Sequence, residues 1–190
     1  ALPGFARITQ GDGLRIGAAT PWSAIAAADL PAACHALQQA ALKVGGRQIQ
    51  NAGTLGGNLC NASPAADGVP PLLALDAEVE LLSAAGTRRL ALGGFLLGPR
   101  KTALAPGEIL ATVVIPDSAL HGRSAFLKLG ARTHLVISIA MVAARLVVAR
   151  VRRLLSTAPR RAPRRSDTAV KAPRARRTEH YRAAQTRNRR

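Results

Sequence analysis

The feature that most constrains the fold is an abrupt change in composition at residue 149. Residues 149–190 hold 15 of the 27 lysines and arginines but only 2 of the 10 acidic residues. The chain's net charge of +17 is therefore concentrated in this tail, and the segment has little apolar periodicity. Such a segment cannot bury enough apolar surface to offset its conformational entropy. We therefore expect a folded domain over residues 1–148 and a disordered basic tail over 149–190. A change of reading frame in the gene is one explanation for the abrupt change in composition.

Residues 1–148 contain signals for both helices and strands. Helices are predicted over 21–29, over 30–44 with Asp29 as a cap and a stripe from Leu30 to Val44, and from Pro70 to Leu75. Alternating apolar residues predict strands over 13–19, 78–81, 89–92, 109–115 and 124–132, and a more buried strand over 135–148. The strands over 78–81 and 89–92 are predicted to form a hairpin. An α+β fold follows, with mixed or antiparallel strands and flanking helices.

The stretch from Arg47 to Asp67 is unusually rich in small and hydrogen-bonding residues. Gly53, Gly56 and Gly57 permit positive φ angles and close approach of a ligand to the backbone. Consecutive amide groups in such a loop can form a concavity that binds phosphate. The stretch therefore predicts a binding loop, with a purely structural turn as the alternative.

Several segments within residues 1–148, taken in order, resemble one known family. They are Thr-Leu-Gly-Gly-Asn-Leu-Cys-Asn-Ala-Ser-Pro-Ala-Ala-Asp (54–67), Pro-Pro-Leu-Leu-Ala-Leu-Asp-Ala (70–77), Gly-Pro-Arg-Lys-Thr (98–102), Pro-Gly-Glu-Ile-Leu (106–110) and Phe-Leu-Lys-Leu-Gly-Ala-Arg (126–132). Together they are similar to the FAD-binding subunit or domain of the molybdenum hydroxylases, which include xanthine dehydrogenase and carbon monoxide dehydrogenase. The resemblance implies a PCMH-type FAD-binding fold, of which residues 1–148 form the central part.

The resemblance also implies the residues that contact FAD. The nucleotide is expected to lie against the segment from Thr54 to Asn58, and further contacts are expected at four separate positions. The full set is Val44, Thr54, Leu55, Gly56, Gly57, Asn58, Asp67, Leu110 and Lys128. Each of the four separate positions has a simpler alternative: Asp67 as a cap of the helix near Pro70, Lys128 as a solvated lysine, and Val44 and Leu110 as core residues.

The implied function is electron transfer within a larger complex. In the family, a molybdopterin-binding large subunit oxidises the substrate, a small subunit with two iron–sulfur clusters passes the electrons on, and FAD delivers them to NAD, oxygen or a quinone. The family also has an earlier glycine-rich pyrophosphate loop and a compact C-terminal subdomain, neither of which this sequence matches. We therefore expect a domain truncated at its N-terminus and altered at its C-terminus, which binds FAD weakly on its own.

Other functions find less support in the sequence. Nonspecific nucleic-acid binding through the basic tail is the main alternative, and a non-functional fragment is a further one. The four histidines lack the spacing of metal ligands, and Cys34 and Cys60 are too few to hold an iron–sulfur cluster. Cys60 is expected to be a small buried packing residue. Since neither a secretory signal nor a membrane-spanning run is visible, we expect a cytoplasmic protein.

Overall fold

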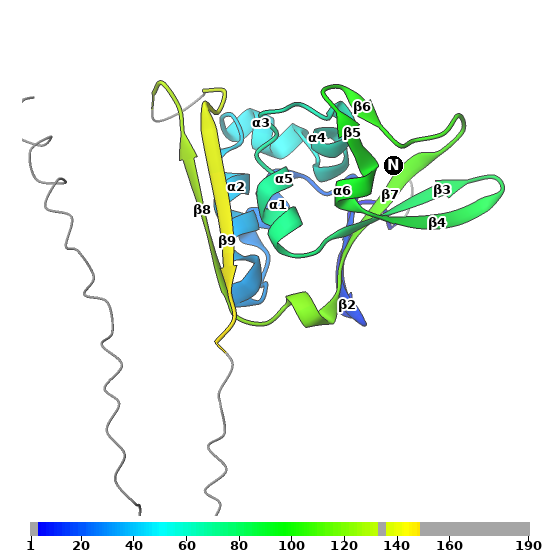
Figure 1. Ribbon diagram of the computed structural model, residues 1–190, viewed down its shortest axis with the longest axis horizontal. Helices are drawn as coiled ribbons and strands as arrows, with labels where there is room; N and C mark the ends of the chain where they lie inside the picture. The colour runs from blue at the N-terminus through cyan, green and yellow to red at the C-terminus, as the bar shows by residue number, and fades with distance from the viewer. Residues whose placement is uncertain (1–3, 133–135, 149–190) are drawn as a thin grey trace, which may run out of the picture. The chain divides into compact units, whose positions relative to one another are not determined.

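The computed structural model describes residues 4–132 and 136–148. They belong to one compact unit, Ala1–Arg150, which is shown in Figure 1. The second unit, Val151–Arg190, lies wholly outside the described residues. The predicted disorder of residues 149–190, and the predicted boundary at residue 148, therefore stay predictions.

A five-stranded antiparallel sheet forms one side of the domain. Its strand order is β1-β2-β7-β3-β4. The strands are β1 (Ile8–Gly11), β2 (Gly13–Gly17), β3 (Glu78–Ser83), β4 (Gly86–Ala91) and β7 (Ile109–Ile115). In the central strand β7, Val113 is opposite Ile16 of β2 and Val79 of β3, and all three are buried. These residues anchor the main apolar core, and the strands predicted over 13–19, 78–81, 89–92 and 109–115 are confirmed.

A layer of short helices lies between this sheet and the hairpin of the last two strands (Figure 1). The α-helices are α1 (Trp22–Ala27), α2 (His35–Lys43), α3 (Arg47–Ala52), α4 (Leu55–Asn61), α5 (Val69–Ala74) and α6 (Leu92–Phe95), with 3-10 turns at Ala32–Cys34 and Asp117–Ala119. Cys34, Leu37 and Ala41 of the predicted apolar stripe are buried. The predicted cap by Asp29 is wrong, because a 3-10 turn after Pro31 leads into α2 and makes no side-chain cap.

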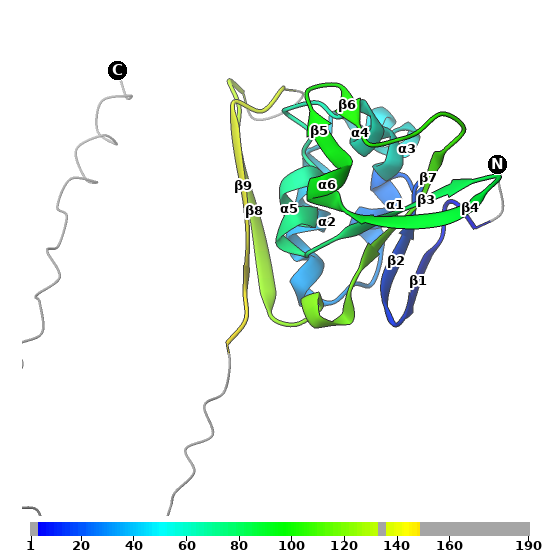
Figure 2. The same cartoon turned by 45° about the vertical axis from the view of Figure 1, so that its right-hand side comes forward.

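The remaining strands form two hairpins. Strands β5 (Leu96–Gly98) and β6 (Lys101–Thr102) make a small one, and β8 (Arg123–Leu129) and β9 (Ala140–Leu146) make a long one. The long hairpin packs against α2 and α5, as both views show (Figures 1 and 2). Phe126 lies on the buried face of β8, while Leu127 and Leu129 lie on the other face.

The prediction of a more buried strand over 135–148 is wrong for the residues that the structure describes. Along β9, exposed residues alternate with half-buried ones. The helices cover only one face of the two-stranded hairpin, so every second apolar residue of β9 points outward. Mixed helices and antiparallel strands otherwise agree with the predicted α+β class. Within residues 4–132 and 136–148, no helix is both long and apolar enough to cross a membrane.

An ion pair fastens the β-hairpin of β3 and β4 to the loop before β7, and it makes stability depend on pH. Arg88 donates two hydrogen bonds to Glu108, at 2.5 and 2.7 Å. These bonds, and a further one from the backbone N–H of Ala105, lower the pKa of Glu108 from 4.5 to about 2. Because the folded pKa lies below the unfolded one, this stabilisation is present above pH 4.5 and is lost as the pH falls towards 2.

We therefore expect Glu108→Gln to flatten the decline of stability between about pH 4.5 and pH 2. The measurement is the urea midpoint of the wild type and the variant at a series of pH values. Parallel profiles for the two proteins would show that the Arg88–Glu108 pair does not contribute to acid sensitivity.

Candidate functional site

The stretch predicted as a glycine loop is helical. Residues 47–52 form α3 and residues 55–61 form α4, with Thr54 as the N-cap between them. None of Gly53, Gly56 and Gly57 has a positive φ angle. The expectation that these glycines serve the backbone conformation is therefore wrong.

The close packing of α4 explains Gly56 instead. The N–H of Gly56 donates to the carbonyl oxygen of Ala18, just after β2, at 2.7 Å. A Cβ atom at Gly56 would lie 2.7 Å from the Cβ of Ala18 and 2.8 Å from its carbonyl oxygen. Only a residue without a side chain lets the helix approach the sheet so closely.

The predicted row of free amides at this site is also wrong. The N–H of Leu55 donates to the carbonyl oxygen of Thr20, at 3.0 Å. The N–H of Gly57 donates to the Thr54 hydroxyl, and the N–H of Asn58 donates to the Thr54 carbonyl, both at 3.1 Å. The amides that start α4 are therefore engaged within the protein, so a ligand here would meet side chains and exposed backbone.

A shallow hollow of about 320 Å³ lies beside the start of α4. It is lined by Phe5, Ala18, Ala19, Thr54, Gly56, Gly57, Cys60, Ile109 and Leu110. Four of the predicted site residues, Thr54, Gly56, Gly57 and Leu110, thus come together from two distant segments. Gly57 is exposed, and because it has no side chain, it leaves the hollow open at this point.

Cys60 also lines this hollow, one helical turn after Gly56. The interpretation of Cys60 as a buried packing residue is wrong, because the residue is exposed, whereas Cys34 is fully buried. The signal for Cys60 was its spacing: residues four apart on a helix share one face. That signal could be used only once the segment was known to be helical.

Asn58 lies on the same helix but points elsewhere. Its Oδ1 atom is buried without a hydrogen-bond partner in the described part of the chain. It packs beside Gly68, where an added Cβ would lie 3.0 Å from this oxygen. A buried carbonyl oxygen that lacks a donor is costly, so this atom is one to which a ligand or an ordered water would bind favourably.

Asp67 and Lys128 contact each other away from the hollow. The Nζ atom of Lys128 donates to Asp67 at 2.7 Å and to the carbonyl oxygen of Lys43 at 3.2 Å. The hydroxyl of Ser138 donates to the second carboxylate oxygen of Asp67 at 2.8 Å. The side chains of Lys128 and Asp67 are only 8% and 10% exposed. This buried cluster ties the β8–β9 hairpin to the helical layer.

The simpler alternatives for these residues can now be judged. Lys128 is not a solvated lysine, and Asp67 does not cap α5, whose N-cap is Gly68 without a side-chain bond. Val44 and Leu55 pack with the main core, Leu55 being fully buried. Ser138 was not predicted, although it is one of only two polar residues, with Arg145, in the apolar run from 135 to 149.

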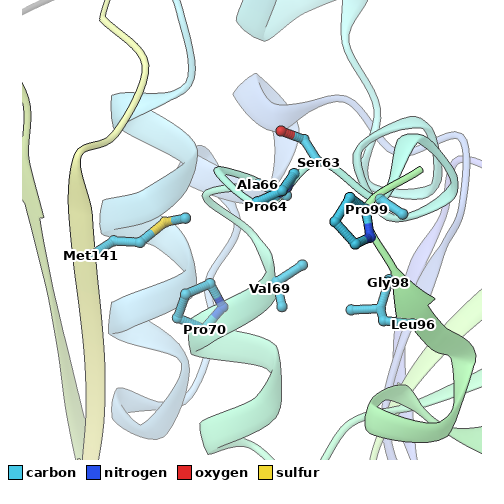
Figure 3. Close-up of a pocket in the computed structure, with 10 residues that line it drawn as sticks. Ser63, Pro64, Ala66, Val69, Pro70, Leu96, Gly98, Pro99 and Met141 are labelled. Atoms are coloured by element: carbon cyan, nitrogen blue, oxygen red, sulfur yellow. The ribbon is translucent and has the colours of Figure 1, made fainter. Parts of the chain in front are cut away.

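A second hollow, of about 270 Å³, opens between the loop after α4, the start of α5, β5 and β9 (Figure 3). Pro64, Pro70 and Pro99 line it, and Met141 reaches towards it from β9. None of the nine predicted site residues lines this hollow. We therefore take the hollow beside α4 as the candidate site.

The geometry defines an α+β domain with a small, largely apolar site at the start of a glycine-containing helix. Comparison with known proteins gives its class. Residues 2–118 match the family described as the FAD binding domain in molybdopterin dehydrogenase. The chain therefore belongs to this family of FAD-binding domains.

The relatives agree in sequence and in structure. The chain is 46% identical over 108 residues to the nicotinate dehydrogenase FAD-subunit of Eubacterium barkeri, a match that covers 55% of this chain and 36% of the relative. It is 36% identical over 137 residues to the xanthine dehydrogenase FAD-binding subunit of Escherichia coli O157:H7, covering 69% of this chain and 46% of the relative. The structure is also similar to a chain of carbon monoxide dehydrogenase from Oligotropha carboxidovorans, with a TM-score of 0.70 and 31% sequence identity. The match covers 76% of this chain and 51% of the carbon monoxide dehydrogenase chain.

The chain thus spans about half the length of these relatives or less. The matches confirm the predicted family of FAD-binding domains, and the relatives named here are subunits or chains of dehydrogenases. They include subunits of larger assemblies, such as the alpha subunit of the 6-hydroxypseudooxynicotine dehydrogenase complex of Paenarthrobacter nicotinovorans.

Proposed function

We propose that this chain forms part of the FAD-binding electron-transfer subunit of a cytoplasmic molybdenum hydroxylase. Its partners are a small subunit with two-iron clusters and a molybdopterin-binding large subunit. In this role it carries electrons from the clusters to NAD, oxygen or a quinone. The observation that supports the proposal most strongly is the hollow that unites Thr54, Gly56 and Gly57 with Leu110 in a chain of this family.

The residues around the hollow suit one portion of a flavin nucleotide. Because Gly56 and Gly57 have no side chains, a flat group in the hollow can contact the backbone of α4. Leu110 and Ile109 supply apolar contacts, and the Thr54 hydroxyl supplies a polar one. Bound FAD supplies the redox chemistry, while the protein orients it and sets its electrostatic surroundings.

The other predicted residues serve the proposed site differently. Asn58 offers its unpartnered buried oxygen to a donor. Asp67 and Lys128 form a buried ion pair beside the loop that joins β8 to β9, where the Lys128 cation becomes available to a negatively charged group once it is displaced from Asp67. Leu55 and Val44 support the site from the core side.

The test is a titration of the full chain with FAD, followed by quenching of flavin fluorescence. We expect saturable binding below about 1 mM, where half-saturation corresponds to about 4 kcal/mol. Gly57→Leu places a branched side chain in the hollow and is expected to weaken binding at least about tenfold, or about 1.4 kcal/mol.

The matched control is Gly93→Leu, which changes an exposed helical glycine of α6 that has open space around it. This variant is expected to bind FAD as the wild type does. Equal affinities for Gly57→Leu and the wild type, with both proteins folded, would rule out the hollow as the flavin site.

A further inference from the structure

The hollow between the end of α4 and β9 has no role in the proposed function. Its volume is about 270 Å³, and its lining side chains are apolar apart from Ser63 (Figure 3). The Ser63 hydroxyl is already engaged, since it accepts a hydrogen bond from the N–H of Ala65 at 3.2 Å. Sites for small molecules are mostly apolar hollows with a few polar groups. We call this one the proline hollow, after Pro64, Pro70 and Pro99.

The walls of the proline hollow suit a flat aromatic group. A proline ring has almost no side-chain freedom, so the three prolines cannot turn inward and fill the space. Met141 reaches towards the space from β9, and a thioether sulfur makes favourable contacts with aromatic rings. A cavity of about 150 Å³ already holds benzene. The proline hollow therefore has room for one aromatic ring or for two fused rings.

One cation is fixed at the rim of the proline hollow. The backbone N–H of Arg100 donates to the carbonyl oxygen of Ala62 at 2.9 Å, and its guanidinium donates to the Oδ1 atom of Asn61 at 3.1 Å. Ala62 and Pro99 both line the hollow. Because Arg100 follows Pro99 in the chain and is bonded to the end of α4, its side chain is held beside the opening.

The positive charge at the rim is not neutralised in the part of the chain that the structure describes. Arg100 bonds to a neutral amide and takes part in no ion pair there, and the exposed Lys101 follows it. None of the residues that line the hollow is acidic. Asp67, which follows the lining residue Ala66, is already paired with Lys128. An anionic substituent on the aromatic ring is therefore favoured.

The backbone of the rim is held in an unusual conformation. Ala62 and Arg100, with φ angles of 44° and 59°, are two of the three non-glycine residues with positive φ in residues 4–132 and 136–148. Such conformations are disfavoured for residues with a side chain, and they cluster at ligand sites. The hydrogen bond between the two residues holds both in place. The rim is therefore set before any ligand binds.

We propose that the proline hollow binds a small aromatic acid. The ring system lies among the three prolines and the thioether of Met141, and the carboxylate accepts hydrogen bonds from the guanidinium of Arg100. The proline hollow shares no lining residue with the hollow beside α4. The site is therefore additional to the proposed flavin site, and its occupancy does not depend on FAD.

The test uses Met141, which is the only methionine of the chain, as a reporter inside the proline hollow. The full chain is labelled with methyl-¹³C methionine and titrated with 2-naphthoate in the absence of FAD. We expect a saturable upfield shift of the Met141 methyl signal, because the ring current of the bound naphthalene acts on it. Half-saturation is expected at about 1 mM, the range of a fragment-sized ligand. Cyclohexanecarboxylate, which has the charge but no aromatic ring, should cause no such shift.

Two pairs of variants separate the proline hollow from general attraction of anions to a basic chain. Leu96→Trp places an indole in the hollow and should weaken binding at least about tenfold, whereas Leu97→Trp, on the next residue of β5, should not, since Leu97 is 64% exposed and lies outside the hollow. Arg100→Gln should weaken binding about threefold, as expected for an exposed ion pair. Arg47→Gln, at an exposed arginine of α3, should leave it unchanged.

Three results would overturn the proposal. The first is a Met141 signal that does not move with 2-naphthoate up to about 10 mM. The second is unchanged affinity in both Leu96→Trp and Arg100→Gln, since the anion would then be held elsewhere. The third is FAD that shifts the Met141 signal and competes with 2-naphthoate, which would assign the hollow to the nucleotide. Met141→Leu identifies the signal, and circular dichroism shows whether Leu96→Trp is folded; if it is not, Arg100→Gln decides.

Discussion

Replacing Lys128 with methionine is expected to lower the free energy of unfolding by about 3–5 kcal/mol. The change leaves the Asp67 carboxylate buried beside the Ser138 hydroxyl but without its ion-pair partner Lys128. Removing one partner of a buried ion pair is costly, because the other charge stays out of water without compensation. The free energy is measured by urea unfolding, followed by circular dichroism.

Lys101→Met is the matched control, because Lys101 is an exposed lysine on β6. It should change the stability by less than about 0.5 kcal/mol. The double variant Lys128→Met/Asp67→Asn should regain part of the loss, since a neutral amide is easier to bury than an unpaired carboxylate. If Lys128→Met is no more destabilising than Lys101→Met, the buried pair does not hold the β8–β9 hairpin.

The second large effect is expected at Gly56. Gly56→Ala should lower the free energy of unfolding by about 1–3 kcal/mol, because the new methyl group overlaps Ala18 and must displace α4 from the sheet. The neighbouring change Gly57→Ala adds a methyl group that meets only the Thr54 hydroxyl, at 3.1 Å. It should be nearly neutral, since alanine favours the helix by up to about 1 kcal/mol over glycine.

Urea unfolding of the two alanine variants shows whether Gly56 is needed for close packing against Ala18 or only for the conformational freedom of its backbone. A large loss at Gly56 and almost none at Gly57 is the result that the structure predicts. Equal losses at both glycines would mean that Ala18 does not crowd a methyl group at position 56.

The sequence predicted the sheet more accurately than the site. The alternation of apolar residues in 109–115 reports directly which side chains face the core, and β7 has those bounds. The helix α4 was missed because its glycines and asparagines are poor helix formers, and α3 was missed because it is a short helix between Gly46 and Gly53. Tertiary contacts outweigh that preference: Leu55 and Leu59 are buried, and Gly56 bonds to Ala18.

Contacts between distant residues were beyond what local patterns predict. Asp67 lies 61 residues from Lys128 and 71 from Ser138, so nothing in the spacing shows that the three meet. The resemblance to a family indicated Asp67 and Lys128 but not their bond to each other. The burial of β9 was predicted wrongly for a related reason. An apolar strand indicates that its side chains favour burial, but it does not show which part of the structure packs against them.

Alkylation of the two cysteines in the presence of FAD tests the central claim most directly. Cys60 lines the hollow beside α4 and is exposed, although partial desolvation raises the pKa of its thiol. Cys34 is an internal reference, because it is buried and burial raises its pKa to about 11. At about pH 8.5, iodoacetamide should therefore label Cys60 well before Cys34.

If the flavin nucleotide binds in the hollow, saturating FAD should slow the labelling of Cys60 at least about fivefold, while the slow labelling of Cys34 stays unchanged. Gly57→Leu should remove this protection, and Gly93→Leu should keep it. Unchanged labelling of Cys60 at FAD concentrations that saturate the fluorescence titration would contradict the account, because the nucleotide would then be bound elsewhere.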